Sequence, residues 1–163
     1  MALSSIILDL ETTGFSPKYN AIIEVAAIKI EGYEEVDRFH TLINPHTPLP
    51  PFIQDLTGLT DKDLRGEPLF SDISTKLISF IGSCPIIAHN SSFDKRFLVA
   101  ADKRFNRFIY KDYLSYVRKI RKSYKSHSLE KICEYLSIEI EAHRALGDVL
   151  ALFEVIKLLG YPK

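Results

Sequence analysis

The chain has 163 residues, of which 46% are hydrophobic and 26% are charged, and its 21 Lys and Arg balance its 21 Asp and Glu. A chain of about 150 residues buries nearly 70% of its unfolded surface, which is enough for one core without covalent cross-links. These values exclude a disordered tail, a collagen and a disulfide scaffold, and they predict a single domain over residues 1–163.

Two features of the sequence indicate the cellular compartment. The only cysteines, Cys84 and Cys133, are too few for an oxidised framework or for a zinc site, and their contexts suit free thiols in a reducing compartment. The apolar N-terminal run lacks a basic leader and is interrupted by Asp9, so we expect neither a signal peptide nor a membrane span. We therefore predict a cytoplasmic protein.

The neutral net charge hides an asymmetry between the two halves of the chain. Residues 1–90 hold 6 Lys and Arg against 12 Asp and Glu, whereas residues 91–163 hold 15 against 9. Both signs suit a solvated surface, but an acidic cluster beside a basic flank is also what a metal site that binds a polyanion needs.

The N-terminal half reads as strands followed by a connection. Apolar runs at residues 5–10, 21–30 and 36–43 predict three strands, and their short spacing favours an antiparallel meander. The Pro-rich run 44–51 is a surface connection rather than a domain boundary, and short helical pieces follow it.

The remainder alternates helices with short strands. Apolar residues at helical spacing predict a helix over residues 69–81, a helix over 91–107, a helix capped by Ser128 and a last helix that ends before Gly160. Residues 85–89 and 108–113 are predicted to be strands. The order predicts an α/β fold in which a mixed sheet is flanked by helices, and ligands of such sheets bind at strand ends.

Asp9 and Glu11 stand two residues apart at the end of the first predicted strand, so their carboxylates lie on one face while Leu8 and Leu10 lie on the other. Like charges about 4 Å apart repel by about 4 kcal/mol at an effective dielectric near 20. A divalent cation held by oxygen ligands would neutralise them, and the small residues that follow permit close approach of a ligand. Taken alone, the pair also fits a solvated strand end.

Two further acidic elements follow later in the chain. Asp94 lies in the first turn of the helix after the strand that ends near His89, where Asn90 or Ser91 is expected to cap the helix. His143 and Asp148 lie at the start of the last helix. Each element alone suits an ordinary first-turn acid or a surface histidine.

Together, the three elements resemble the DnaQ-like 3′-to-5′ exonucleases of the DEDDh type, closest to the proofreading domain or epsilon subunit of bacterial DNA polymerase III. The motifs are Asp9-Leu10-Glu11-Thr12-Thr13-Gly14, His89-Asn90-Ser91-Ser92-Phe93-Asp94 and His143-Arg144-Ala145-Leu146-Gly147-Asp148, and their order and separations match over nearly the whole chain. The resemblance implies an RNase H-like five-stranded mixed sheet with antiparallel strands 1–3.

The same resemblance implies a site. It puts Asp9, Glu11, Asp94 and Asp148 around two divalent ions, Mg²⁺ or Mn²⁺, with His143 as the general base. The chemistry agrees, because two ions about 4 Å apart supply an activated water and charge neutralisation, carboxylates suit such hard ions, and a histidine with a pKa near 6.5 accepts a proton near neutral pH.

Several residues are expected on the substrate side. The resemblance implies that Thr12 and Thr13 contact the terminal nucleotide, and Asn90 suits a polar contact near the scissile phosphate. Phe15 can stack on a base or can pack within the protein, and both interpretations stay open. The basic run 118–125 suits either a nucleic-acid backbone or a solvated helix face.

The function that follows is a metal-dependent exonuclease that releases nucleoside 5′-monophosphates from 3′ ends of single-stranded or frayed DNA. A 3′-to-5′ exoribonuclease and a catalytically silent DNA-binding accessory domain are the alternatives, because no motif reports how the 2′-hydroxyl is treated. Nucleic acid is the expected partner, and a DNA polymerase is a second one if the role is proofreading. No association with a membrane is expected. The sequence ends at Lys163, directly after the last helix, which suits a free-standing enzyme, an excised domain or a subunit that docks by its surface.

Overall fold

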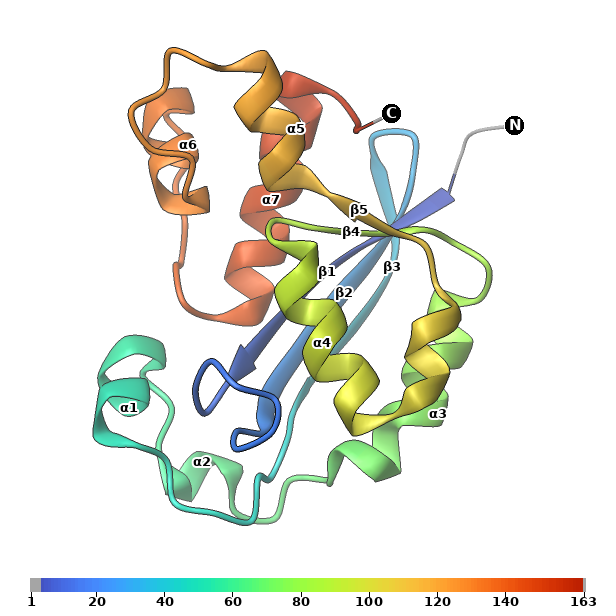
Figure 1. Ribbon diagram of the computed structural model, residues 1–163, viewed down its shortest axis with the longest axis vertical. Coiled ribbons are helices and arrows are strands. Elements are labelled where there is room, and N and C mark those ends of the chain that lie inside the picture. The colour runs from blue at the N-terminus through green and yellow to red at the C-terminus, as the bar shows by residue number, and fades with distance from the viewer. Residues whose placement is uncertain (1–3, 163) are drawn as a thin grey trace.

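The computed structural model describes residues 4–162 and contains one five-stranded sheet with the order β3-β2-β1-β4-β5 (Figure 1). The bounds of the elements, in chain order, are β1 (Ser4–Thr12), β2 (Ile22–Glu31), β3 (Glu34–Leu42), α1 (Pro51–Thr57), α2 (Asp61–Leu64), α3 (Phe70–Ile81), β4 (Ile86–Ala88), α4 (Ser91–Ala101), the 3₁₀ helix η1 (Lys103–Arg107), β5 (Tyr110–Asp112), α5 (Tyr113–Ile120), α6 (Leu129–Leu136) and α7 (Ala145–Leu159).

The sheet is mixed, as predicted. Strands β1, β2 and β3 pair antiparallel, whereas β4 pairs parallel with β1 and β5 pairs parallel with β4. The parallel connections run through helices, which is the usual crossover for parallel strands. Strand β1 lies at the centre, so the residues at its end are surrounded by neighbouring strands and helices. No helix within residues 4–162 is long and apolar enough to cross a membrane.

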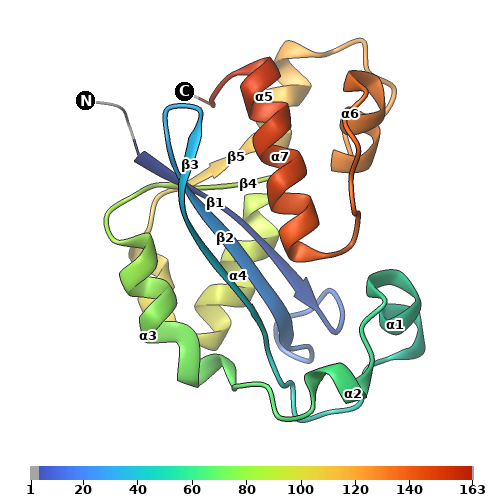
Figure 2. The ribbon, with the colours of Figure 1, turned by 180° about the vertical axis from the view of Figure 1, so that it is seen from behind.

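Helices cover both faces of the sheet (Figures 1 and 2). On one face, alternate residues of β1 pack against α3, α4 and η1, and the buried side chains there include Ile6, Leu8, Leu10, Leu77 and Phe105. On the other face, α5, α6 and α7 pack over a core that includes Ile7, Ile28, Val117, Ile132 and Phe153. A smaller cluster joins β2 to α1 and α2. Because strand side chains alternate faces, β1 contributes to both cores.

The predicted helix over residues 91–107 is wrong after Ala101. Helix α4 ends at Ala101, Asp102 adopts an extended backbone, and η1 follows as a separate 3₁₀ helix. The Asp102 carboxylate accepts the Arg104 N–H at 2.9 Å, so it caps a new helix start instead of continuing the old one. Asp competes with helix propagation in this way because its short side chain reaches nearby backbone N–H groups.

Candidate metal and catalytic site

Strand β1 provides the first two acidic residues. Asp9 pairs with Ala26 of β2 and Glu11 pairs with Glu24, and the register shifts immediately after Glu11. Their neighbours Leu8 and Leu10 are buried in the core on the α3 and α4 side. The alternation of β1 therefore directs both carboxylates toward the α7 face, as the sequence predicts.

Helix α4 brings Asp94 to the same place. The residue lies in the first turn of the helix and is 3% exposed. Of the two residues expected to cap this helix, Asn90 is the one that stands at its N-cap. Asn90 occupies the cap position without a side-chain cap bond, and the Ser91 N–H donates to the Asp112 carboxylate at 2.9 Å. A carboxylate from β5, distant in sequence, thus takes the role that a local side chain was expected to fill.

The start of α7 contributes His143 and Asp148. His143 precedes the helix with a left-handed backbone (φ 61°), and its N–H hydrogen-bonds to the Asp148 carboxylate. Gly147 lies between them, and a Cβ built on it would be 2.1 Å from the Glu141 carbonyl oxygen. Only glycine therefore permits the close approach of the preceding loop to the first turn of α7.

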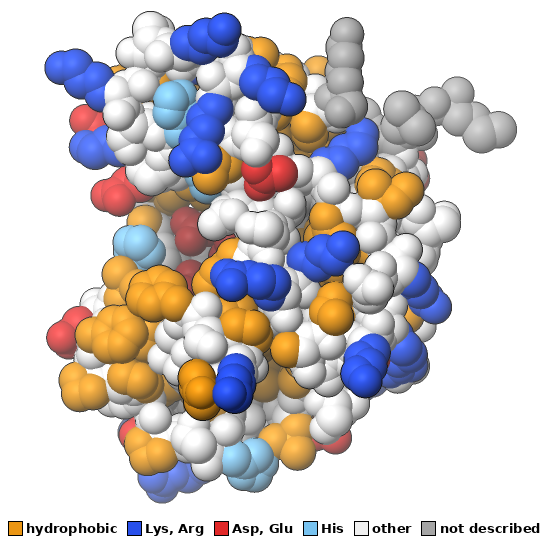
Figure 3. Space-filling view, viewed as in Figure 1, with side chains coloured by type: hydrophobic (Ala, Val, Ile, Leu, Met, Phe, Trp, Pro, Cys, Tyr) orange, Lys and Arg blue, Asp and Glu red, His pale blue; other side chains and the backbone are white. Residues whose placement is uncertain are grey.

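These elements meet in one cleft. A hollow of about 220 Å³ is lined by all five of the predicted residues, Asp9, Glu11, Asp94, His143 and Asp148, and also by Asn90. Carboxylate oxygens of Asp9, Glu11 and Asp148 lie within 4.8 Å of one another. Figure 3 shows acidic side chains at the bottom of a hollow on this face, with Lys and Arg gathered above it and hydrophobic side chains below it.

The four carboxyl groups of the cleft are too buried and too close together to be ionised at the same time without a large cost. Burial and the neighbouring acids, Asp94 first among them, hold the pKa of Asp9 well above its usual range. Burial, with Asp148 and Glu24 adding repulsion, raises the pKa of Glu11 to about 8. Burial likewise raises the pKa of Asp94 and of Asp148 to about 7 each. The cluster is therefore short of positive charge, and hard oxygen ligands at this spacing can hold a divalent cation.

The predicted substrate residues on the loop after β1 differ in how exposed they are. Thr12 and Thr13 are both 6% exposed. The Thr12 hydroxyl donates to the Gly14 carbonyl, and that of Thr13 accepts from the Ala21 N–H, so both side chains stabilise the loop after β1. The Phe15 ring is 75% exposed on the same loop, which excludes a packing role for it within residues 4–162.

Glu24 is a residue of the site that no sequence motif indicated. Its side chain is fully buried and accepts two bonds from Arg144, one from the Ala145 N–H, and contacts His40. Burial alone would raise the pKa of Glu24, but the bonds from Arg144 and His40 outweigh it and lower the pKa. The available signal was an acid with apolar neighbours on both sides within a predicted strand, since such a charge must find a partner when it is buried.

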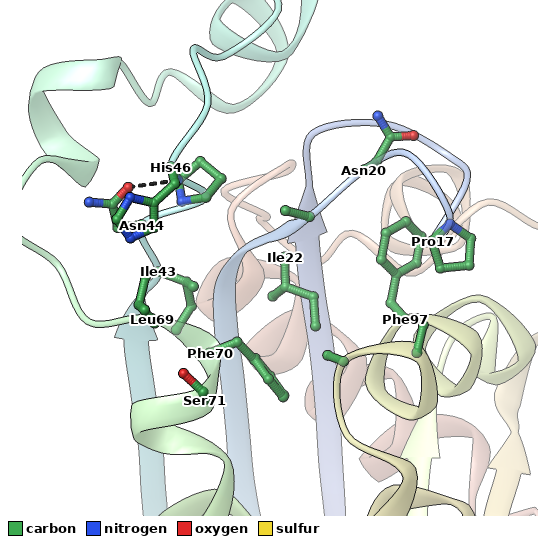
Figure 4. Close-up of a pocket in the computed structure, with 14 residues that line it drawn as sticks. Pro17, Asn20, Ile22, Ile43, Asn44, His46, Leu69, Phe70, Ser71 and Phe97 are labelled. Atoms are coloured by element: carbon green, nitrogen blue, oxygen red, sulfur yellow. Dashed lines mark hydrogen bonds between the residues drawn. The ribbon is translucent and has the colours of Figure 1, made fainter.

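A second hollow, of about 350 Å³, lies on the other side of the loop after β1 (Figure 4). Aliphatic and aromatic side chains such as Ile22, Phe70 and Phe97 line most of it. Its amides hold neighbouring backbone, because Asn20 accepts from the Ser16 N–H and Asn44 from the His46 N–H. It has no acidic lining residue, so the metal-binding chemistry belongs to the acidic cleft.

The chain is similar in sequence to known proteins. The family model described as Exonuclease (RNase_T) matches residues 6–156. The PolC-type DNA polymerase III of Halalkalibacterium halodurans is 38% identical over 151 residues, which are 90% of this chain and 10% of that protein. The corresponding protein of Thermotoga maritima is 32% identical over 170 residues, covering 97% of this chain and 12% of that protein. The chain thus spans about a tenth of these curated relatives.

Solved structures share the fold. Exonuclease I of E. coli in complex with a dT13 oligonucleotide superposes with a TM-score of 0.82 at 18% identity, over 98% of this chain and 41% of that one. Exonuclease X in complex with 5′ overhanging duplex DNA gives a TM-score of 0.74 at 21% identity, over 96% and 93%. With the sequence matches over nearly its whole length, this chain belongs to the exonuclease family, in its DnaQ-like DEDDh group.

Proposed function

We propose that this chain is a metal-dependent 3′-to-5′ exonuclease that releases nucleoside 5′-monophosphates from single-stranded or frayed DNA 3′ ends. The observation that carries the proposal is the convergence of four carboxylates and one imidazole, from three distant stretches of the chain, on one cleft. Because its relatives are PolC-type DNA polymerases III, the proposed role is proofreading beside a DNA polymerase. The cytoplasmic location remains a prediction.

Each residue has a role in the proposal. Asp9, Glu11 and Asp148 would hold one divalent ion, Mg²⁺ or Mn²⁺, and Asp94 would help to hold a second. Two such ions neutralise charge on the entering and leaving oxygens of a phosphodiester and activate water. An imidazole nitrogen of exposed His143, at the rim of the cleft, accepts the proton of the attacking water.

The loop after β1 and the start of α4 would hold the substrate. The exposed ring of Phe15 supports stacking on an unpaired base, because an aromatic face binds any nucleobase. Asn90 is exposed at the rim and supports a polar contact to the terminal phosphate. Thr12 and Thr13 would act mainly by fixing the shape of the loop, because their hydroxyls already form hydrogen bonds with its backbone. A direct contact with the nucleotide would use the second hydrogen bond that each hydroxyl can still form.

The test is product analysis on matched DNA and RNA oligomers labelled at the 5′ end, with Mg²⁺ and with Mn²⁺. The proposal expects a ladder shortened from the 3′ end and free 5′-mononucleotides, faster on DNA, with no products in EDTA or from Asp148→Asn. Faster degradation of RNA would make the chain an exoribonuclease. Oligomer binding without cleavage in either metal would make it an accessory domain and would overturn the proposal.

A further inference from the structure

The buried carboxylate of Glu24 joins the sheet to the start of α7. Its two oxygens accept from Arg144 Nε and Nη2, both at 3.1 Å, and from the Ala145 N–H at 3.2 Å, while His40 Nε2 lies 2.7 Å away. A bidentate Arg–carboxylate pair fixes orientation as well as distance, because two parallel bonds allow one relative geometry. Glu24 thus connects β2, β3 and the first turn of α7.

Two of the partners of Glu24, Arg144 and Ala145, lie between His143 and Asp148 in the sequence. Arg144 directly follows His143, and its carbonyl accepts the Asp148 N–H at 2.9 Å. Across the sheet, Glu24 is the register partner of Glu11. The bonds of Glu24 therefore connect the strand pair that carries Asp9 and Glu11 to the helical turn that carries Asp148.

The backbone conformation of His143 explains why this connection matters. A non-glycine residue in the left-handed region is uncommon and persists where neighbouring contacts hold it. His143 has φ 61°, and the residue that follows it is held by two bonds to a fully buried carboxylate. Loss of these bonds would free the backbone that places His143 at the rim of the cleft.

We propose that Glu24 and Arg144 are positioning residues. Their ion pair sets His143, just before α7, and Asp148, in the first turn of α7, at the distance from Asp9 and Glu11 that metal binding and proton transfer require. The inference rests on the proposed function. The guanidinium of Arg144 also balances the charge of Glu24. It thereby reduces the repulsion that Glu24 would otherwise add to the acids of the cleft.

The remainder of α7 does not depend on this pair. Val149, Leu152, Phe153 and Ile156 are buried in the core on this face of the sheet, so apolar packing holds the helix after its first turn. Removing the pair should therefore displace the first turn without unfolding the helix. This separates a positioning role from a purely structural one.

The experiment compares Arg144→Lys, Arg144→Gln and the double variant Glu24→Gln/Arg144→Gln with the unaltered chain. The double variant leaves no buried charge without a partner, so it guards against failure to fold. Arg38→Gln is the matched control, because Arg38 forms a bidentate pair with Glu35 on β3 that is exposed. Readouts are kcat and KM on a DNA oligomer, Mn²⁺ affinity of the whole chain, and amide exchange of residues 143–149 without metal.

We expect a tenfold to hundredfold loss in kcat and about a tenfold loss in Mn²⁺ affinity, as is typical when the partners of metal ligands are removed, with KM for DNA changed less than about twofold. Amide exchange should rise in residues 143–149 and not in the rest of α7. Arg144→Lys should rescue only part of the loss, because lysine cannot form the bidentate pair. The control should behave as the unaltered chain does.

The proposal is overturned if the double variant keeps its kcat, Mn²⁺ affinity and local amide protection while only its melting temperature falls. Failure of the proposed function gives a different result, in which the unaltered chain cleaves neither DNA nor RNA. In that case, Mn²⁺ affinity and amide exchange still decide whether Glu24 and Arg144 position the cluster.

Discussion

Asp9 is required by the proposed metal chemistry, but its charge is disfavoured in the metal-free fold. Its pKa lies well above the usual range because of burial and of Asp94, Asp148 and Glu11 around it. Asp9→Asn keeps the shape but removes the charge. We expect kcat to fall by roughly 100-fold or more, since the metal supplies several kcal/mol of charge stabilisation and about 1.4 kcal/mol is a factor of ten.

The same substitution should leave the metal-free protein as stable as before or more stable at neutral pH, because it removes a source of repulsion. Thermal unfolding in EDTA and steady-state kinetics in Mg²⁺ measure the two effects. Asp37→Asn on the exposed face of β3 is the control, with neither effect expected. A variant that loses stability in EDTA and keeps its activity would contradict this account.

The raised acids also predict how stability depends on pH. Glu11, Asp94 and Asp148 have pKa values of about 8, 7 and 7, well above their values of about 4 in an unfolded chain. Between about pH 4 and pH 8 the folded state holds protons that the unfolded state has lost, so the free energy of unfolding falls as pH rises. Melting temperature in EDTA across this range measures the slope, and a rise would be inconsistent with it.

Divalent ions should reverse that trend, because they compete with protons for the same carboxylates and bind only the folded site. The increase in melting temperature on adding Mn²⁺ should be small near pH 5 and large near pH 8, where Glu11 with its pKa of about 8 begins to ionise. Differential scanning calorimetry with and without Mn²⁺ gives this difference directly. An equal increase at both pH values would mean that the ion binds elsewhere.

At the level of single residues, the predictable part of the site was the part that carries ordered motifs. Asp9, Glu11, Asp94, His143 and Asp148 stand at element ends that an α/β fold brings together, and they line one cleft. Glu24 was not predicted, because its role depends on a partner 120 positions away. Alternation of apolar residues reports burial, but it does not report which cation will meet a buried acid.

At the level of elements, the start of α7 depends on Gly147. In Gly147→Ala the new Cβ would meet the Glu141 carbonyl at 2.1 Å, so the loop that carries His143 must move. We expect the free energy of unfolding to fall by about 1–3 kcal/mol, which is the usual cost of overpacking, and kcat to fall more than the affinity for DNA. Denaturant unfolding and kinetics test this. Leu158→Ala on the exposed side of the same helix is the control and should alter kcat little.

Element boundaries were predicted well where local signals decide them and poorly where tertiary bonds do. Ser128 caps α6 with its own side chain, as expected, by accepting the Lys131 N–H. The start of α4 instead depends on Asp112 of β5, and the end of α4 on the competition that Asp102 introduces. Neither could be read from apolar periodicity, because a capping carboxylate can come from any part of the chain.

At the level of the whole molecule, the charge asymmetry becomes a surface feature. Lys and Arg gather over α5 and α6, above the acidic hollow (Figure 3). The loop between these helices reaches the cleft, because the ring of His89, a lining residue, hydrogen-bonds to the His127 carbonyl at 2.9 Å. Within residues 4–162, Arg118, Lys119 and Lys122 are exposed and form no ion pair. Such cations attract a phosphate backbone.

Replacing Arg118, Lys119 and Lys122 by Gln should therefore raise KM for long oligonucleotides and leave kcat unchanged. For each cation that binds a phosphate of a single strand, its replacement should reduce the salt slope of log(kcat/KM) by about 0.7. A small chromogenic phosphodiester of thymidine, which fills the cleft without reaching α5, should be cleaved as before. Neutralising Lys62, Lys76 and Lys103, which are equally exposed on other elements, controls for net charge. If the two triple variants have the same salt slope, long-range charge attracts the substrate, and not a surface formed by α5 and the turn after it. If only the first variant has a smaller salt slope, the nucleic-acid strand passes over that surface on its way to the metal site.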